Sequence, residues 1–163
     1  MDIWLLRHAA AEERSASGRD EDRELTADGA KRARAVARGL ATLNAGIGLV
    51  VSSPYRRARQ TADPAVEALG LSRKFRESRA LEPASDPAEI LAEVEGEDAE
   101  GVLLVGHQPH LGVLLGQLVA GGHVEIPLKK ASLARVVLEG QGKGTLRAIL
   151  PARVLEELGR ARG

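Results

Sequence analysis

A short apolar run near the N-terminus ends abruptly on two polar residues, and this largely decides which folds are open to the chain. Residues 3–6 are wholly apolar and are followed directly by Arg7 and His8. An unbroken apolar run of this length is typical of a strand buried in a parallel sheet. An unpaired charge is costly to bury, so Arg7 and His8 are expected just beyond the carboxyl end of that strand. Open α/β sheets bind their ligands at this edge.

Two later apolar runs end in the same way. Residues 49–51 lead through Ser52, Ser53 and Pro54 into an arginine-rich segment, and residues 102–105 lead through Gly106 to His107. Proline suits the start of a helix, so Arg57 is expected in the first turns of a helix, where free N–H groups and arginines favour anions. Parallel strands end at one edge of a sheet, so these side chains are expected to converge with those of Arg7 and His8.

The remaining segments predict helices between the strands and a hairpin after them. Apolar periodicity and cap residues place helices after Thr26, after Pro54, after Asp86 and over residues 111–119. Pro64 is expected to break the second helix, with Asp63 capping a new piece that ends at Gly70. The expected segments also include an edge strand at residues 73–76, hairpin strands at residues 132–138 and 145–150, and a closing helix at residues 151–158. This pattern predicts an α/β three-layer sandwich with a largely parallel central sheet flanked by helices, in one domain over residues 1–163.

Composition excludes several classes of function. Basic and acidic residues balance at 23 each, which argues against a general polyanion binder. One Trp, one Tyr and one Phe cannot build a stacking platform for single-stranded nucleic acid. The absence of cysteine excludes disulfides, thiolate zinc sites and a cysteine nucleophile. No apolar run approaches the roughly 18 residues of a membrane span, and no secretory signal is evident. We therefore expect a cytoplasmic globular protein.

Two histidines and two arginines at neighbouring strand ends suit the chemistry of a phosphoryl group. Arginines present rigid N–H forks that neutralise phosphate oxygens. One neutral histidine can attack phosphorus, and a second, protonated histidine can stabilise the transferring group. These residues alone do not decide between His8 and His107 as the nucleophile. No metal or other cofactor is expected, because the two arginines and the second histidine carry the positive charge and no obvious metal-binding carboxylate cluster accompanies them.

Four motifs give the chain a resemblance to a known family. They are Leu6-Arg7-His8-Ala9, Leu25-Thr26 with Gly29, the segment Ser-Ser-Pro-Tyr-Arg-Arg-Ala-Arg-Gln-Thr at residues 52–61, and Val105-Gly106-His107-Gln108-Pro109. Together they resemble the histidine phosphatase superfamily, also called phosphoglycerate-mutase-like, and within it the short bacterial phosphohistidine phosphatases of the SixA type. Ala9 stands where the family usually has glycine. Arg57 is matched to the family arginine because it directly precedes Ala58.

The resemblance implies a metal-independent phosphatase. It implies that His8 is transiently phosphorylated, while Arg7, Arg57 and His107 hold the phosphoryl oxygens. The expected substrate is phosphohistidine on a protein. The alternatives are a small phosphorylated metabolite and, from another class, a phosphate- or phosphoprotein-binding module without turnover.

The proton donor for the leaving group is open at this point. Glu82 is the nearest candidate, with Glu13 and Asp86 behind it, although Glu82 is equally well an ordinary loop acid. Because an imidazole leaves far more easily than an alkoxide, a phosphohistidine phosphatase can work without a dedicated acid. The short segment between Arg57 and His107 leaves little room for a lid, which predicts an open site.

Several other polar residues have an ordinary structural interpretation, and some have a functional interpretation as well. Residues 9–24 read as a mobile solvated loop, in which one of Arg14, Arg19 and Arg23 can instead hold an anionic substrate. Ser53 reads as a turn or cap residue and His110 as a helix-start residue. The remaining interpretations are surface ion pairs for Arg56 and Arg59, an exposed loop position for His123, and a solvated or acid-attracting pair for Lys129 and Lys130.

Overall fold

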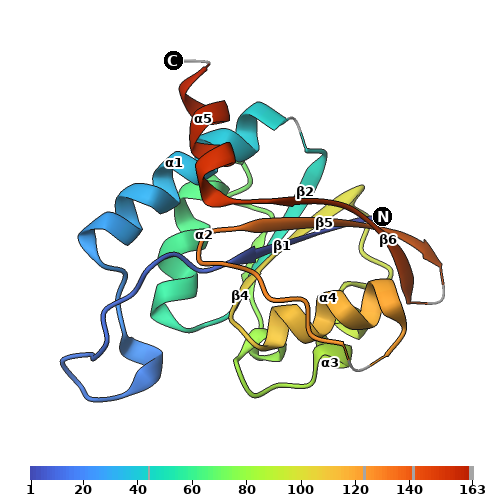
Figure 1. Ribbon diagram of the computed structural model, residues 1–163, viewed down its shortest axis with the longest axis horizontal. Coiled ribbons are helices and arrows are strands. Elements are labelled where there is room, and N and C mark those ends of the chain that lie inside the picture. The colour runs from blue at the N-terminus through green and yellow to red at the C-terminus, as the bar shows by residue number, and fades with distance from the viewer. Residues whose placement is uncertain (44, 123, 141, 162–163) are drawn as a thin grey trace.

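The computed structural model describes residues 1–43, 45–122, 124–140 and 142–161, which form one six-stranded sheet with helices on both faces (Figure 1). The strands follow the order β3-β2-β4-β1-β5-β6 across the sheet. Neighbours among β3, β2, β4 and β1 are parallel, whereas β5 is antiparallel to β1 and to β6. The strands are β1 Asp2–Arg7, β2 Ile47–Ser52, β3 Phe75–Glu77, β4 Gly101–Gly106, β5 Leu133–Gly140 and β6 Lys143–Leu150. The predicted sandwich with a largely parallel sheet and a terminal hairpin is confirmed.

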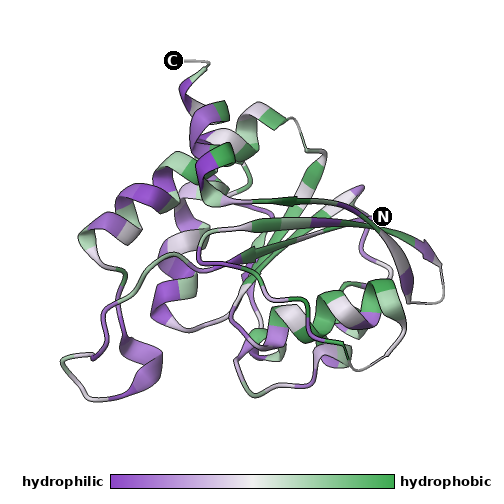
Figure 2. Ribbon diagram, viewed as in Figure 1, coloured by the Kyte–Doolittle hydropathy of each residue, from purple (hydrophilic) through white to green (hydrophobic). Residues whose placement is uncertain are grey.

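Two apolar cores lie on opposite faces of the sheet. Along β1, Trp4 and Leu6 belong to one core, while Ile3 and Leu5 belong to the other. The first core packs under α1 Ala27–Leu43, α2 Arg56–Leu69 and α5 Ala152–Arg160, and the second under α3 Pro87–Val94 and α4 His110–Ala120. Figure 2 shows apolar residues concentrated along the strands and α4. No helix among the described residues combines the length and apolar character needed to cross a membrane.

The capping signals read from the sequence operate as expected. The Thr26 hydroxyl accepts a hydrogen bond from the Gly29 amide at 2.9 Å, and the Asp86 carboxylate accepts one from the Ala88 amide at 2.9 Å. Each bond satisfies an amide in a helix's first turn that lacks an intrahelical partner. At the C-terminal end of α2, Gly70 adopts the left-handed conformation, with φ of 68°. These local interactions explain why several helix ends were predictable.

The predicted break at Pro64 is wrong. Helix α2 runs without interruption from Arg56 to Leu69, with Pro64 inside it. An interior proline removes a hydrogen bond and costs about 3 kcal/mol, but burial of Ala58, Ala62 and Ala65 against the first core offsets this cost. Asp63 does not cap a new helix and pairs instead with Arg59 at 2.7 Å.

Element bounds differ from the predicted ones by a few residues. The edge strand β3 begins at Phe75 rather than residue 73, and α5 extends to Arg160. Three positions for which the sequence predicts turns or loops, Asn44, His123 and Gln141, lie outside the described residues.

Strand register brings the polar strand ends to one level. Arg7 of β1 pairs with Gly106 of β4, and Ser52 of β2 pairs with Val105 of β4. The residues that follow these three strands therefore emerge together at one edge of the sheet.

Candidate active site

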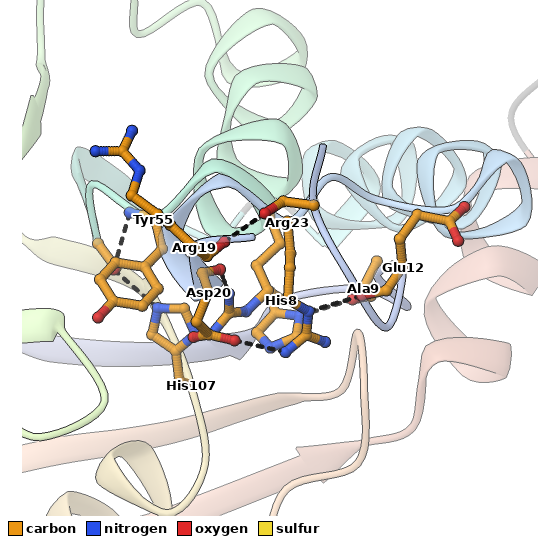
Figure 3. Close-up of polar contacts among 11 residues, drawn as sticks. His8, Ala9, Glu12, Arg19, Asp20, Arg23, Tyr55 and His107 are labelled. Atoms are coloured by element: carbon orange, nitrogen blue, oxygen red, sulfur yellow. Dashed lines mark hydrogen bonds and ion pairs between the residues drawn. The ribbon is translucent and has the colours of Figure 1, made fainter. Parts of the chain in front are cut away.

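His8 and His107 lie next to each other beyond the ends of β1 and β4 (Figure 3). Their ring centroids are 5.1 Å apart, with the ring planes inclined by 57°. Both side chains are buried, His107 almost completely. The sequence-based expectation that the two histidines converge is confirmed.

The two predicted arginines are held beside this pair. Arg7 donates from Nη1 to the Leu128 carbonyl at 2.7 Å. Arg57 lies in the first turn of α2, where its guanidinium stacks over Tyr55 at 5.0 Å, and Tyr55 meets His107 edge-on at 5.1 Å. The positive charge of Arg57 acts on the pKa of both histidines. Arg57 and the two histidines therefore lie in one cluster, and the charge of Arg7 also acts on His8.

The hydrogen bond of His8 decides which of its nitrogens is reactive. Its Nδ1 lies 2.7 Å from the Ala9 carbonyl oxygen. A carbonyl can only accept, so Nδ1 must carry the proton of the neutral ring. The lone pair is therefore on Nε2, and the ring is fixed in the tautomer that a nucleophilic histidine needs.

His107 is held by a serine that the sequence marked only as a turn residue. Ser53 Oγ lies 2.8 Å from His107 Nε2 and accepts a hydrogen bond from the Tyr55 amide at 3.3 Å. A hydroxyl accepts up to two hydrogen bonds and donates one, so this contact fits both neutral tautomers of His107: Nε2 either accepts from the hydroxyl, with the ring proton on Nδ1, or donates to it. Among the described residues Nδ1 has no hydrogen-bond partner, and it is buried. In the first tautomer Nδ1 is a free N–H donor of the kind that binds a phosphoryl oxygen.

Burial keeps both histidines neutral in the free protein. Burial lowers the pKa of His8 to about 4, with a further contribution from the charges of Arg57, Arg7 and Lys130. Burial and the charges of His8 and Arg57 lower the pKa of His107 to about 2. Phosphoryl chemistry at this pair would use a protonated second histidine, but burial keeps His107 neutral in the free protein. An incoming phosphoryl anion favours the protonated form.

These shifts predict that the protein loses stability as the pH falls below 7. Burial also lowers the pKa of His110. A histidine with an ordinary pKa near 6.5 takes up its proton in the unfolded chain while His8, at about 4, stays neutral in the fold. Stability from these groups is therefore complete above about pH 7 and falls through the window between the two pKa values, by up to about 1.4 kcal/mol per pH unit for each histidine. Urea unfolding at pH 7, 6 and 5 measures this loss.

The matched control for that measurement is the variant His8→Asn. It removes one titrating group and should show a shallower pH dependence than the wild type over the same range. An equal slope in both proteins would rule out His8 as a contributor.

The three candidate proton donors, Glu82, Asp86 and Glu13, have different surroundings. Glu82 follows the short helix η2 Arg79–Leu81 and lines a cavity of about 240 Å³ together with Tyr55. Among the described contacts it bonds to neither histidine, and its carboxylate lies 3.6 Å from Arg79 Nε. Asp86 is occupied in capping α3, and Glu13 is exposed on the 9–24 loop.

The 9–24 loop places one predicted arginine near the site and another away from it. Arg19 pairs with Asp22 at 2.7 Å and is a solvated ion pair. Arg23 donates to the carboxylate of Asp20 at 2.7 Å, and Asp20 in turn accepts from Arg57. The loop contains a short helix, η1 Asp20–Asp22. Sequence analysis missed Asp20, which lies in a run of charged residues with no pattern that distinguishes it.

Other polar residues have the structural roles that the sequence predicts for them. Arg56 pairs with Glu24 at 2.6 Å and Arg59 with Asp63, both at the surface. His110 begins α4, as predicted. Within the described ranges, no three or more His, Asp and Glu side chains are grouped so that they could hold a metal ion.

A turn with a strained residue lies against the end of β1. Ala131 has φ of 57°, a conformation rare for a residue with a Cβ. Its amide lies 3.1 Å from the Arg7 carbonyl and 3.3 Å from that of His8. Lys129 and Lys130 of this turn are exposed, and the charge of Lys130 contributes to the lowered pKa of His8.

Comparisons with known proteins show that the chain is similar to phosphatases. A family model described as histidine phosphatase superfamily (branch 1) matches residues 3–82. The phosphohistidine phosphatase SixA of Escherichia coli (strain K12) is 31% identical over 150 residues, which are 89% of this chain and 90% of that protein. A structure of the protein histidine phosphatase SixA with tungstate superposes with a TM-score of 0.86 at 27% identity, covering 95% of this chain and 99% of that one. A mycobacterial glucosyl-3-phosphoglycerate phosphatase, at 19% identity, a TM-score of 0.67 and coverage of 90% and 97%, shares the fold.

Proposed function

The chain belongs to the histidine phosphatase superfamily and is a phosphatase, and from this premise we propose that it hydrolyses phosphohistidine on a protein through a phosphorylated His8. The observation that carries the proposal is the fixed tautomer of His8. Its Nδ1 is bonded to the Ala9 carbonyl, and its pKa of about 4 keeps Nε2 unprotonated at neutral pH. A nucleophile needs that state before substrate arrives.

The proposed reaction has two displacements at phosphorus. His8 Nε2 attacks the phosphoryl group, the substrate P–N bond breaks, and the departing imidazole takes a proton from solvent water. Water then attacks phospho-His8, the new P–N bond breaks, and His8 recovers its lone pair. The protons of the attacking water stay on the inorganic phosphate that leaves or pass to solvent. Arg7, Arg57 and the free Nδ1–H of His107 donate to the equatorial oxygens in both steps, where fixed donors have most effect.

Two observations support a phosphohistidine substrate. Among the described contacts Glu82 bonds to neither histidine, so no acid in the described part of the free site is aligned for an alkoxide leaving group. An imidazole has a pKa near neutrality and needs no such acid. The similarity to phosphohistidine phosphatase SixA over most of both chains supports the same substrate class.

One feature favours a second candidate, a small phosphorylated metabolite. Tyr55 and Glu82 line one cavity, and the Tyr55 ring also meets His107 edge-on at 5.1 Å, which makes Glu82 the acid to test for protonation of a leaving oxygen. The mycobacterial neighbour of the same fold is a glucosyl-3-phosphoglycerate phosphatase. Membership of a phosphatase family argues against the third alternative, a binding module without turnover.

Phosphate release from two substrates, with EDTA present, distinguishes these candidates. We expect a kcat/KM at least about tenfold higher for a phosphohistidine-bearing protein than for an alkyl ester such as glycerol phosphate, because only the ester needs an acid. The variant Glu82→Gln should leave phosphohistidine hydrolysis unchanged. Comparable activity on the ester that Glu82→Gln removes would establish the metabolite reading in its place.

A further inference from the structure

Asp20 bonds to the two terminal nitrogens with which Arg57 would hold a phosphoryl group. Its carboxylate accepts from Arg57 Nη2 at 2.9 Å, and its backbone carbonyl accepts from Arg57 Nη1 at 2.7 Å. Figure 3 shows Asp20 projecting toward His8 and His107 from the loop that crosses the site. Both terminal nitrogens of Arg57 are therefore engaged by a single residue.

Little of Arg57 is left for a ligand while Asp20 is in place. Its side chain is 5% exposed, and among the described residues its Nε is buried without a partner. The Asp20 side chain, by contrast, is 54% exposed. Because the carboxylate already bonds to Nη2, a phosphoryl oxygen that approaches Nη2 competes with it.

The competing carboxylate is charged and held by a second arginine. Its other oxygen accepts from Arg23 Nη1 at 2.7 Å. Partial burial favours the neutral acid, but hydrogen bonds from Arg23 and Arg57 outweigh this effect and hold the pKa of Asp20 below its ordinary value. A carboxylate between two guanidinium groups imitates two oxygens of a phosphoryl group.

We propose that Asp20 competes with phosphate for Arg57 and so promotes release of the product. The carboxylate occupies Nη2 in the free protein, moves into solvent when the phosphoryl group of the substrate binds, and returns as inorganic phosphate leaves. A phosphoryl dianion displaces it because it carries more charge and more acceptor oxygens, whereas monoanions do not. This inference rests on the role of Arg57 in holding the phosphoryl group, as proposed above.

The variant Asp20→Asn tests the competition directly. Asparagine keeps the size of the side chain and the backbone carbonyl that holds Arg57 Nη1, but it removes the charge. We expect inorganic phosphate to bind about tenfold more tightly, a change equal to about 1.4 kcal/mol, and to inhibit turnover more strongly. Calorimetric titration with phosphate and product inhibition of the wild type and the variant give the two constants. A gain in affinity is a readout that mere structural damage does not produce.

Asp22→Asn is the matched control. Asp22 lies in the same loop and bonds to Ser17 and Arg19 rather than to Arg57, so its loss should leave phosphate affinity unchanged. Asp20→Glu keeps the charge and should remain close to the wild type. If Asp20→Asn is too unstable for titration, the rise of its Tm with phosphate concentration gives the same affinity.

The outcomes separate this inference from the proposed function. Unchanged or weaker phosphate binding in Asp20→Asn, in a wild type that hydrolyses phosphohistidine, would overturn the competition and leave the proposed function standing. Tighter phosphate binding in a protein without phosphohistidine activity would support the competition and overturn the proposed substrate.

Discussion

Replacing His8 with alanine is expected to lower kcat for phosphate release by on the order of 10⁴-fold, the scale seen when a nucleophile is removed. His107 is not expected to substitute for it, because its Nε2 is engaged by the Ser53 hydroxyl and its Nδ1 is buried. Initial rates with a phosphohistidine-bearing protein give the size of the loss. Rapid quenching of the wild type should also trap a phosphoryl adduct that is stable to alkali and labile to acid, and His8→Ala should not form it.

The same experiment decides a question that the residues alone left open. His107→Asn removes the other histidine and should slow formation of the adduct without moving it to a new position. If His8→Ala still forms the adduct and His107→Asn does not, the assignment of the nucleophile is reversed. Circular dichroism of both variants establishes that the fold is retained.

Arg57→Ala is expected to lower kcat/KM by about 10²–10³-fold, as the loss of one charged donor to a transition state typically does. Arg57→Lys should recover little, since an ammonium group lacks the planar fork that Arg57 presents. The stability cost should be small in comparison, because the Asp20 carboxylate is half-exposed and regains water when its partner is lost. Steady-state kinetics with phosphohistidine substrate, alongside thermal unfolding, measure both effects.

The adjacent arginine provides the control. Arg56→Ala removes an equal charge one residue away, but Arg56 pairs with Glu24 at the surface, where such pairs contribute little. It should retain nearly full activity. A similar loss in both variants would indicate that general positive charge, and not the placement of Arg57, supports the reaction.

The parts of this site that the sequence predicted are those fixed by strand ends. Arg7, His8 and His107 follow apolar runs directly, and parallel pairing brings such ends to one edge whatever loops intervene. Pro54 predicted that the arginines after it lie at the start of a helix, and the family resemblance selected Arg57 among them because it directly precedes Ala58. Capping residues such as Thr26 and Asp86 were also predictable, because each side chain bonds to an amide only a few residues further along the chain.

The parts that escaped prediction depend on contacts between distant segments. Ser53 reaches His107 across 54 positions, and Arg57 reaches Asp20 across 37. Neither contact leaves a local pattern, and Asp20 looks like any acid in a charged loop. Pro64 shows the opposite failure, because a strong local signal for a helix break was overruled by burial of neighbouring alanines. Local sequence patterns predict where helices and strands start and end, but long-range packing decides which distant residues make contact.

The spacing of the two histidines has a consequence for how the protein can diverge. Their centroid separation of 5.1 Å is close to the spacing of about 4.8 Å between hydrogen-bonded strands, and each ring follows a strand at the same level of the β1–β4 ladder. The distance between the two histidine rings is thus set by backbone pairing, which does not depend on which apolar residues fill the core. Apolar side chains of similar volume can therefore replace one another without moving the two rings, and a structure with 27% identical residues superposes with a TM-score of 0.86.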